Sequence, residues 1–510
     1  MKRIPWIILV IMSVFLGNCA KEWEEHYEPV QESINMKLWD TLVTMEQFSE
    51  FIKYAELYDL DTVIQASNAK TLFLPDNDAF QSYLAGDTTG IVETMMYHVV
   101  PTFFMLRNVD DQYRLKTLDG KYALVSNDDY QYKVDGIDIL NSSDLFLDGK
   151  YYETDSVLVP KPNLYQYLTY NSSSIKEYID SRDSIVLDRE NSKPIYFNDQ
   201  GQTVYDSVVT IVNLFEEEYF AITEEYENIA ATLVVPDQVA YETALDNMAS
   251  FLGDHYASHE DIPLDWQNNE LIPLLLNRGV YGGLLEPEYF NRTKIANING
   301  DSILVDLELD PASRYICSNG LVYNYSTFEI GDSLYKDRNF EAEDFVESLG
   351  LGKYVWSKEF VTVGGNQALL PDEQRVPGTS NDTIVNIDFP TGYTGDYSVN
   401  FKIGRIFPNS YRLVWRTNYR TSGIYAVYVN GERIQLGLSK YDTFDTYQLS
   451  GGFFSVLGYK LYPDSRGFCT IDGWVEIEEY GDVNITLEYL DSGSSSDNGL
   501  NIDYLQLLFR

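Results

Sequence analysis

Cysteine and basic residues are scarce in this sequence. Only three cysteines occur in 510 residues, Cys19, Cys317 and Cys469, so no disulfide framework is expected, and the last two are interpreted as small buried residues. Lysine and arginine number 36 against 79 acidic residues, which gives a formal net charge of −43. Because nucleic-acid binding relies on basic residues that neutralise phosphates, nucleic acid is a poor partner for this chain.

Long apolar runs are also rare. The first runs from Ile4 to Leu16, roughly 13 residues against the about 20 that span a bilayer, and nothing later approaches 18 uninterrupted apolar residues. Lys2 and Arg3 precede this run and Cys19 follows it. That layout is typical of a removable secretion signal. We therefore expect everything after the signal to be soluble, with a net charge of −45 once Lys2 and Arg3 are removed.

The cysteine that closes the apolar run indicates an anchor. Residues 1–18 resemble a lipoprotein signal peptide, although Asn18 departs from the commoner small residue there. The resemblance implies that Cys19 becomes a lipidated first residue; plain secretion with an ordinary thiol is the alternative. Residues 19–32 resemble the acidic tethers that send lipoproteins to the cell exterior, or are simply a solvated linker. The expected location is the outer membrane, lipid-anchored and facing outward.

Catalytic motifs are missing. The sequence contains no Gly-x-Ser-x-Gly elbow, phosphate-binding loop or zinc-protease helix. Glycoside hydrolysis needs two carboxylates about 5 to 9.5 Å apart, but 79 acidic residues supply candidate pairs everywhere, so their presence decides nothing. We expect a protein that is not an enzyme.

Apolar residues are plentiful enough for packed domains, at 44% of the chain. Between Ser33 and Tyr58 they recur at three- and four-residue steps, which predicts an amphipathic helix. A strand-like run, Thr71 to Leu74, then stops at Pro75, and Asp76 or Asn77 can cap the helix that follows.

Three ordered segments of residues 33–161 resemble a fasciclin-like domain. They are Thr71 to Phe80 (TLFLPDNDAF), Tyr97 to Pro101 (YHVVP) and Asp155 to Pro160 (DSVLVP). The resemblance implies an α+β fold and a possible adhesive role for Tyr97 and His98. A lone histidine among apolar helix residues is otherwise a structural residue.

Residues 162–336 resemble a second, divergent fasciclin-like domain with insertions. Thr232 to Asp237 (TLVVPD) repeats the strand and turn, and Ser318 to Tyr323 (SNGLVY) resembles the late strand of the family. The central histidine is missing, since Leu275-Leu276-Asn277 stands roughly where it is expected.

Residues 337–510 show short alternating strands with Gly, Asn and Ser turns, as in an all-β sandwich. The two ends, Asn339 to Phe345 and Asn501 to Leu507, and the middle, Ser410 to Gly431, resemble a family 6-type carbohydrate-binding module, a galactose-binding-like jelly roll. The whole chain is thus predicted to hold two α+β fasciclin-like domains followed by this sandwich.

Strand alternation separates core from surface in the sandwich. Val475 and Ile477 face one way and Trp474 the other, so Trp474 is a candidate platform for a sugar ring. Trp415 falls in an apolar row and is expected in the core. The resemblance further implies sugar contacts from Tyr419 and Asn501, unless the sandwich has lost its ligand.

Glu341, Glu343 and Asp503 come from opposite ends of the sandwich sequence, which a jelly roll brings together. Carboxylates about 4 Å apart repel by roughly 4 kcal/mol at an effective dielectric near 20, so such a cluster calls for a cation. Calcium suits several oxygen ligands, and the resemblance implies a structural calcium here. Separate solvated acids are the alternative.

These expectations combine into a non-catalytic surface lipoprotein for adhesion or glycan capture. Its partners are the membrane through the lipid, and a glycan or an extracellular matrix or surface protein. An accessory or assembly subunit of an outer-membrane complex is the first alternative, and a glycan-active enzyme the second.

Overall fold

The computed structural model describes residues 33–509, with internal gaps. The undescribed residues within that range are 67, 129–130, 189–190, 305–308, 310–312, 394–395, 419–423, 435–443, 446–453, 457–458, 462–467 and 492–498. The expected signal, Cys19 and the acidic tether lie outside the described residues. Within the described ranges, no helix has both the length and the apolar character that a membrane crossing requires.

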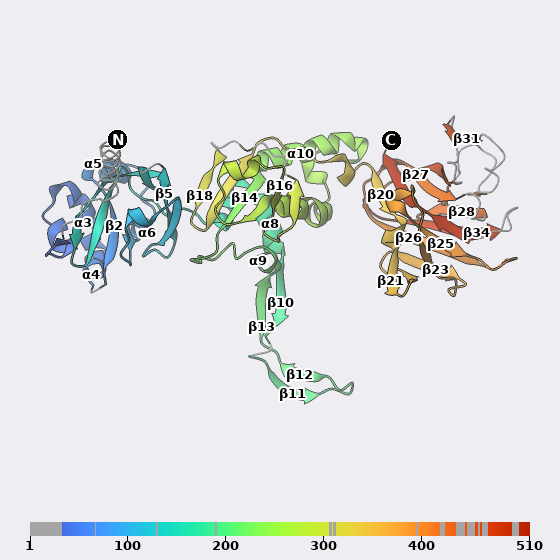
Figure 1. Ribbon diagram of the computed structural model, residues 1–510, viewed down its shortest axis with the longest axis horizontal. Coiled ribbons are helices and arrows are strands. Elements are labelled where there is room, and N and C mark those ends of the chain that lie inside the picture. The colour runs from blue at the N-terminus through green and yellow to red at the C-terminus, as the bar shows by residue number, and fades with distance from the viewer. Residues whose placement is uncertain are drawn as a thin grey trace, which may run out of the picture. The chain divides into compact units, whose positions relative to one another are not determined.

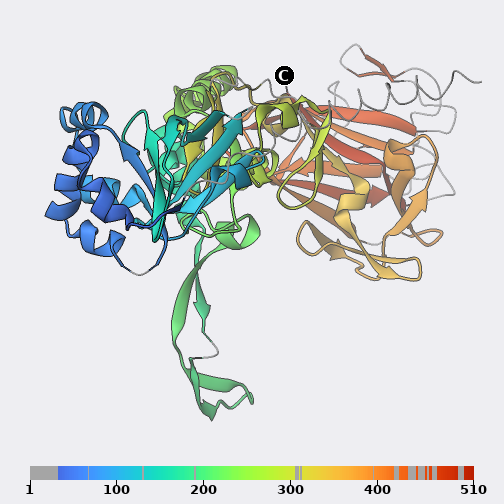
Figure 2. The same cartoon turned by 60° about the vertical axis from the view of Figure 1, so that its left-hand side comes forward.

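The chain divides into two compact units, which Figures 1 and 2 show from two directions. The first comprises Met1–Gln238 and Leu275–Tyr325, and the second comprises Val239–Leu274 and Ser326–Arg510. Helices and mixed sheets build the first unit, and strands dominate the second. The predicted order, α+β domains followed by an all-β sandwich, is therefore confirmed.

The first unit opens with short helices where the sequence predicted one long helix. The segment forms α2 (Leu38–Leu42), a 3-10 turn (Glu46–Phe48) and α3 (Ser49–Leu57). The break falls at Thr44 and Met45, because the Thr44 hydroxyl donates to a backbone carbonyl at 2.6 Å and Met45 is extended at φ −92°, ψ 106°. The predicted apolar positions still face one core, including Leu38, Leu42, Phe48, Phe51, Ile52 and Ala55.

A fully buried strand, β2 (Lys70–Pro75), is the centre of the first repeat. It runs antiparallel to β3 (Val99–Val100) on one edge and parallel to β9 (Gly149–Thr154) on the other. Asp76 then caps α5 (Asn77–Leu84), since its Oδ1 accepts the N–H of Ala79 at 2.8 Å. The predicted strand, turn and helix are all present.

The second repeat reproduces this arrangement around β14 (Ala231–Pro236), which is also fully buried. β14 runs antiparallel to β15 (Val280–Gly282) and parallel to β19 (Gly320–Tyr325). These are the same two relationships that β2 has with its neighbours. The structure itself thus reveals an internal duplication.

One hydroxyl in each repeat marks the same place. Thr71 Oγ1 donates to the Thr102 carbonyl at 3.0 Å and accepts the Phe104 N–H at 2.8 Å. Thr232 Oγ1 makes the same pair of bonds, at 2.8 and 2.9 Å, with backbone groups of the segment after β15. Each threonine therefore hydrogen-bonds its buried strand to the segment that follows the antiparallel neighbour, β3 or β15.

The missing histidine of the second repeat is replaced by Gly279. The paired registers place Gly279, immediately before β15, at the position that His98 occupies before β3. The sequence had placed this position near residues 275–277, so that alignment was wrong by a few residues. A Cβ on Gly279 would lie 2.3 Å from the Val234 carbonyl oxygen, so a larger side chain requires the strands to move apart.

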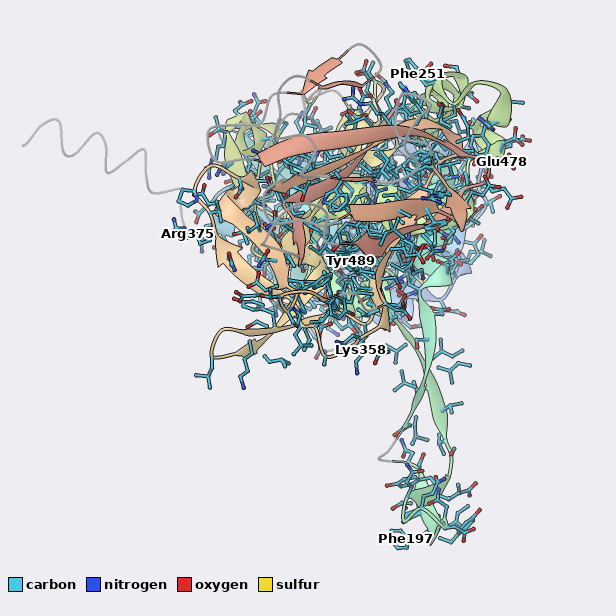
Figure 3. All side chains as sticks on the ribbon, turned by 90° about the vertical axis from the view of Figure 1, so that its right-hand side faces the viewer. Phe197, Phe251, Lys358, Arg375, Glu478 and Tyr489 are labelled. Atoms are coloured by element: carbon cyan, nitrogen blue, oxygen red, sulfur yellow. The ribbon has the colours of Figure 1, made fainter. Side chains whose placement is uncertain are left out.

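An insertion between α8 (Ser173–Ser181) and α9 (Leu214–Glu218) extends from the second repeat. It consists of residues 183–213, here called the arm, and it projects away from the rest of the first unit (Figure 1). Two successive two-stranded ribbons form it. In the first, β10 (Asp183–Leu187) pairs with β13 (Val209–Asn213), and in the second, β11 (Lys193–Phe197) pairs with β12 (Thr203–Asp206). Phe197 lies near the far end (Figure 3).

The second unit contains the β-sandwich. One sheet has the order β20-β36-β27-β33 and another the order β23-β26-β34-β28-β29. In the first of these sheets the strands are β20 (Arg338–Glu341), β36 (Tyr504–Phe509), β27 (Asn409–Asn418) and β33 (Phe468–Ile477). In the second they are β23 (Val361–Gly365), β26 (Tyr397–Ile406), β34 (Gly481–Asp491), β28 (Ile424–Val429) and β29 (Glu432–Arg433). A third sheet contains β24 (Asp372–Arg375), β25 (Thr383–Asp388) and β35 (Gly499–Ile502).

Residues 239–274 belong to the same compact unit as the sandwich. Trp266 is fully buried, and its ring meets Phe407 edge-on with centroids 5.0 Å apart. Arg405 Nη1 lies 3.2 Å from a carboxylate oxygen of Glu270. Packing therefore joins these helical residues to the sandwich.

Candidate functional site

Tyr97 and His98, the expected adhesion pair, lie inside the first repeat. Both residues are 0% exposed, at the end of α6 (Ile91–Tyr97). The Tyr97 hydroxyl donates to Asp135 Oδ2 at 2.7 Å and lies 3.1 Å from the Tyr122 carbonyl oxygen. A direct contact with a partner would require the domain to open. In the folded chain, Tyr97 and His98 contact only other parts of the domain.

His98 is held between two backbone groups. Its Nε2 accepts the Leu158 N–H at 3.0 Å, so Nδ1 carries the proton and donates to the Phe73 carbonyl at 2.6 Å. Burial lowers the pKa of His98 to about 4. The neutral imidazole therefore joins β2 to the closing segment of the repeat.

Asp135 occupies a tight turn aimed into the domain. Asp135 and Gly136 have positive φ values of 51° and 85° between two antiparallel strands, as an Asp-Gly hairpin turn requires. Asp135 Oδ1 also accepts the Leu124 N–H at 2.8 Å. Burial raises the pKa of Asp135, and burial with the nearby Asp135 charge raises the pKa of Tyr97 well above its ordinary value.

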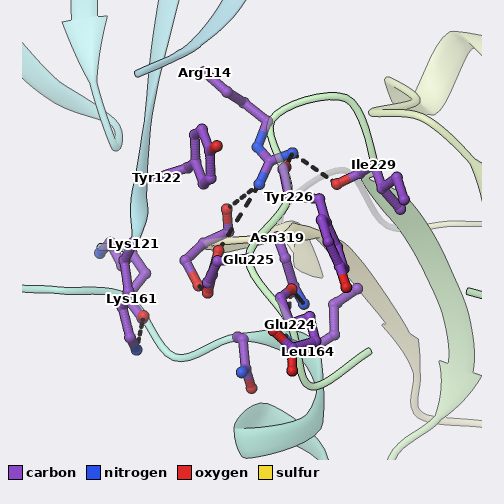
Figure 4. Close-up of polar contacts among 12 residues, drawn as sticks. Arg114, Lys121, Tyr122, Lys161, Leu164, Glu224, Glu225, Tyr226, Ile229 and Asn319 are labelled. Carbon is purple, nitrogen blue, oxygen red and sulfur yellow. Dashed lines mark hydrogen bonds and ion pairs between the residues drawn. The ribbon is translucent and has the colours of Figure 1, made fainter. Parts of the chain in front are cut away.

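Arg114 connects the two repeats (Figure 4). Its guanidinium donates to the carbonyls of Tyr226 and Ile229 at 3.0 and 2.8 Å, and to that of Ser318 at 2.9 Å. It also lies 4.3 Å from the centroid of the Tyr122 ring. Sequence reasoning missed this residue, whose only signal was a lone arginine in an alternating strand of an acidic chain.

A groove with a volume of about 740 Å³ lies beside Arg114, within the first unit. Its lining mixes polar and apolar surface and comes from both repeats: Asn108, Asp110, Asp111, Gln112, Tyr113, Arg114, Glu227, Asn228, Ile229, Ala230, Gly282, Gly283 and Leu284. Tyr113 is 46% exposed and stacks on Phe104 with ring centroids 5.3 Å apart. An exposed ring beside amides and carboxylates can accommodate a polar ligand with an apolar face.

Strand alternation correctly separated core from surface in the sandwich. Val475 and Ile477 are buried, whereas Trp474 is 41% exposed on the opposite face of β33. Trp415 is buried, as expected, and its indole N–H donates to the Asn501 carbonyl at 3.2 Å. Trp474 thus presents part of its ring at the surface.

The other expected sugar contacts do not gather around Trp474. Asn501 is buried on β35, with its side chain near that of Asn386, and Tyr419 lies outside the described residues. Trp474 pairs with Arg412 of β27, whereas the Asn501 carbonyl accepts from Thr417 of that strand. At about 3.3 Å per residue these positions are roughly 16 Å apart.

The three expected calcium ligands have different surroundings. Glu341 Oε2 and Glu343 Oε2 are buried without a hydrogen-bond partner among the described residues. Asp503 instead forms an ion pair with Arg416 and accepts the Ser380 N–H at 2.9 Å. No set of three or more candidate metal ligands is grouped within the described part of the chain. Glu341 and Glu343 each leave one buried oxygen available to a cation, while Asp503 already has a cationic partner.

Burial raises the pKa of Asp503 to about 6, and the Glu341 charge adds to this effect. The Ser380 N–H and the Arg416 guanidinium oppose it. Glu341 and Asp503 therefore repel each other electrostatically even with the arginine present, which is the condition that a bound cation relieves.

Comparison with known proteins identifies one part of the chain directly. Residues 46–160 match the fasciclin domain family, so this part of the chain is a fasciclin domain. A search of curated proteins gave no match.

Three solved structures are similar to larger parts of the chain. The FAS1 domain pair of the insect cell adhesion molecule fasciclin I is 13% identical, with 56% of this chain and 97% of that one covered and a TM-score of 0.22. A family 35 carbohydrate-binding module from Clostridium thermocellum is 14% identical, covering 34% and 98%, with a TM-score of 0.21. A Paenibacillus xanthan lyase is 15% identical, covering 38% and 16%, with a TM-score of 0.24. None of these likenesses bears on ligand or activity.

Acid is expected to loosen the fasciclin domain through His98. Its pKa is about 4 in the folded chain against 6.5 ordinarily, so the unfolded state binds the proton first and stability falls as the pH drops from about 6.5 toward 4. The loss approaches about 3 kcal/mol. Amide hydrogen exchange of residues 156–159, corrected for its intrinsic pH dependence, measures it. His98→Gln should flatten this response and His255→Gln, an exposed control, should keep it; an equal response in all three chains contradicts the assignment.

Proposed function

We propose that this chain is a non-catalytic, lipid-anchored protein of the outer cell surface that captures glycans or adheres to surfaces. The observation that carries the proposal is the combination of a fasciclin domain with a separate β-sandwich that exposes an aromatic ring, Trp474. Fasciclin domains are typically non-catalytic, which supports a binding role. The partner is a glycan or a surface protein displayed outside the cell.

The proposed ligand follows from the chemistry of the exposed ring. Trp474 shares its face of β33 with Glu476, and Glu478 follows directly after the strand; both glutamates are exposed. A flat indole can pack against the apolar face of a sugar, while neighbouring polar groups bind its hydroxyls. Tyr419 and Asn501 remain sugar contacts predicted from the sequence, but Asn501 is buried roughly 16 Å from Trp474, so the site proposed here rests on Trp474 and its exposed neighbours.

Glycan binding should depend on the Trp474 ring. We expect the whole chain to bind at least one member of an oligosaccharide panel, and Trp474→Ala to weaken that binding about tenfold, the equivalent of about 1.4 kcal/mol. Isothermal titration measures the change. Phe360→Ala is the matched control, because Phe360 is 39% exposed in the same unit. Absence of binding by the unmodified chain refutes glycan capture, and weakening by Tyr113→Ala instead moves the site to the groove beside Arg114.

We also propose a structural calcium ion in the sandwich, held by Glu341 and Glu343 and approached by Asp503. The buried, unpaired oxygens of the two glutamates support this assignment. The ion would neutralise the charge at the start of the sandwich, where Glu341 and Glu343 flank the buried Ala342.

Calcium should stabilise the sandwich. At a calcium concentration about 100 times Kd, binding adds about 2.7 kcal/mol, which raises Tm by roughly 5 to 10 °C for a domain of this size. Differential scanning calorimetry with calcium or with a chelator measures the shift. The combined change Glu341→Gln and Glu343→Gln should abolish it, and Glu347→Gln, at an exposed glutamate of the same segment, should not. An unchanged Tm in the unmodified chain rules the ion out.

The anchor is proposed to be lipid on Cys19. Several acyl chains together hold a protein on a membrane far more firmly than one chain does. We expect mass spectrometry of the N-terminal peptide to find acylated Cys19, and Cys19→Ala to release the protein from the membrane fraction. Cys317→Ala is the control, because Cys317 is a buried free thiol. An unacylated thiol at residue 19, or intact protein in the cytosol, refutes the proposed location.

A further inference from the structure

The arm exposes more apolar surface than an isolated ribbon can shield. Eight of its large apolar residues are at least 44% exposed: Ile185, Val186, Ile195, Tyr196, Phe197, Val208, Val209 and Ile211. Among the described residues of the arm, only Ser192 is buried. A lone two-stranded ribbon is marginally stable in water, and three or more strands are needed for independent stability. The arm therefore lacks part of the structure that would stabilise it.

One edge of the arm has the features that natural edge strands avoid. β13 pairs with β10 alone among the described strands, so its outer edge presents unpaired backbone groups. Residues 207–215 (SVVTIVNLF) carry no charge, and 208–212 are all β-branched. Edge strands of monomeric proteins normally carry charges or prolines that prevent pairing with another chain. The outer edge of β13 has neither.

One face of the ribbon is apolar across both strands. The register sets Ile185 opposite Ile211 and Leu187 opposite Val209, so four aliphatic side chains lie together on one face. β10, by contrast, is bounded by Asp183 and Asp188. Of the two edges, β13 is thus the one that can accept a neighbouring strand without burying a charge.

We propose that the arm is a dimerisation element, and that its occupant is the arm of a second copy of this chain, paired antiparallel along the outer edge of β13. In the symmetric register that matches β13 with itself, its central residue, Ile211, lies opposite Ile211 of the second copy. Pairing then gives a four-stranded sheet, β10-β13 followed by the same two strands in reverse order. The two apolar faces join into one.

The surface available beside β13 suits a reversible dimer. Five of the eight exposed apolar side chains, Ile185, Val186, Val208, Val209 and Ile211, lie on or beside the ribbon that pairs, and at about 100 Å² each they supply roughly 500 Å² per partner, within the range of weak, transient interfaces. A two-fold axis makes the contact self-complementary and closed, because each copy has one such edge.

The chain's negative charge opposes dimerisation but acts at a distance. Screening limits the repulsion to about 8 Å at physiological ionic strength, and the nearest acidic residues along the chain, Asp206 and Glu216, flank the uncharged segment. Added salt is consequently expected to strengthen the dimer. A contact based on ion pairs would weaken instead.

Sedimentation of the whole chain from residue 20, across a range of concentrations, tests the proposal. We expect a reversible monomer and dimer, with Ile211→Lys weakening the dimer at least tenfold because two lysines then face each other. Leu57→Lys is the matched control: Leu57 is 65% exposed and Ile211 67%. A monomer at every concentration, growth beyond the dimer, or a dimer unaffected by Ile211→Lys overturns the proposal.

Crosslinking locates the contact independently of affinity. Directly opposed residues of antiparallel strands lie within disulfide range. Ile211→Cys should form a covalent dimer under mild oxidation, and Leu57→Cys should not. A dimer in sedimentation that Ile211→Cys fails to crosslink is joined elsewhere, which contradicts the assignment to β13.

Discussion

The structure of the first unit depends on two strands that are buried along their whole length and hydrogen-bonded on both edges. β2 and β14 each have an antiparallel neighbour on one side and a parallel neighbour on the other. Since a buried backbone must satisfy all its polar groups, neither strand can shift by a residue without losing bonds on both edges. This fixed register positions Thr71 and Thr232, and it determines that His98 in one repeat corresponds to Gly279 in the other.

The sequence predicted what depends on neighbouring residues. The strand that ends at Pro75, the cap at Asp76 and the alternation around Trp474 follow from local spacing, and all three are present. The break at Thr44 was missed because the apolar period continues across it, and only a side-chain bond to the backbone reveals it. Arg114 was missed for a different reason. Its partners are backbone carbonyls more than 100 residues away, and every residue has a backbone carbonyl, so no residue type identifies them.

The candidate site residues fall into two physical groups. Tyr97, His98 and Asn501 are buried and hydrogen-bonded within the chain, so they stabilise the fold and are not accessible to another molecule. Trp474 and Tyr113 are partly exposed and can meet other molecules without a conformational change. Sequence motifs favoured the first group, because residues that stabilise a fold recur in fixed patterns. Surface residues were recognised only where strand alternation placed them.

The base of the arm is closed by one residue. Asn213 donates to the Ile179 carbonyl at 2.7 Å and to Asp183 at 2.8 Å, and its Oδ1 accepts the first N–H groups of α9. Asp183 and Asn213 are also directly paired, so the chain leaves and re-enters the domain at a single point. An insertion of this kind can lengthen, shorten or disappear during evolution without altering the two helices, α8 and α9, that flank it. Relatives that share the fasciclin scaffold are therefore free to differ at this one position.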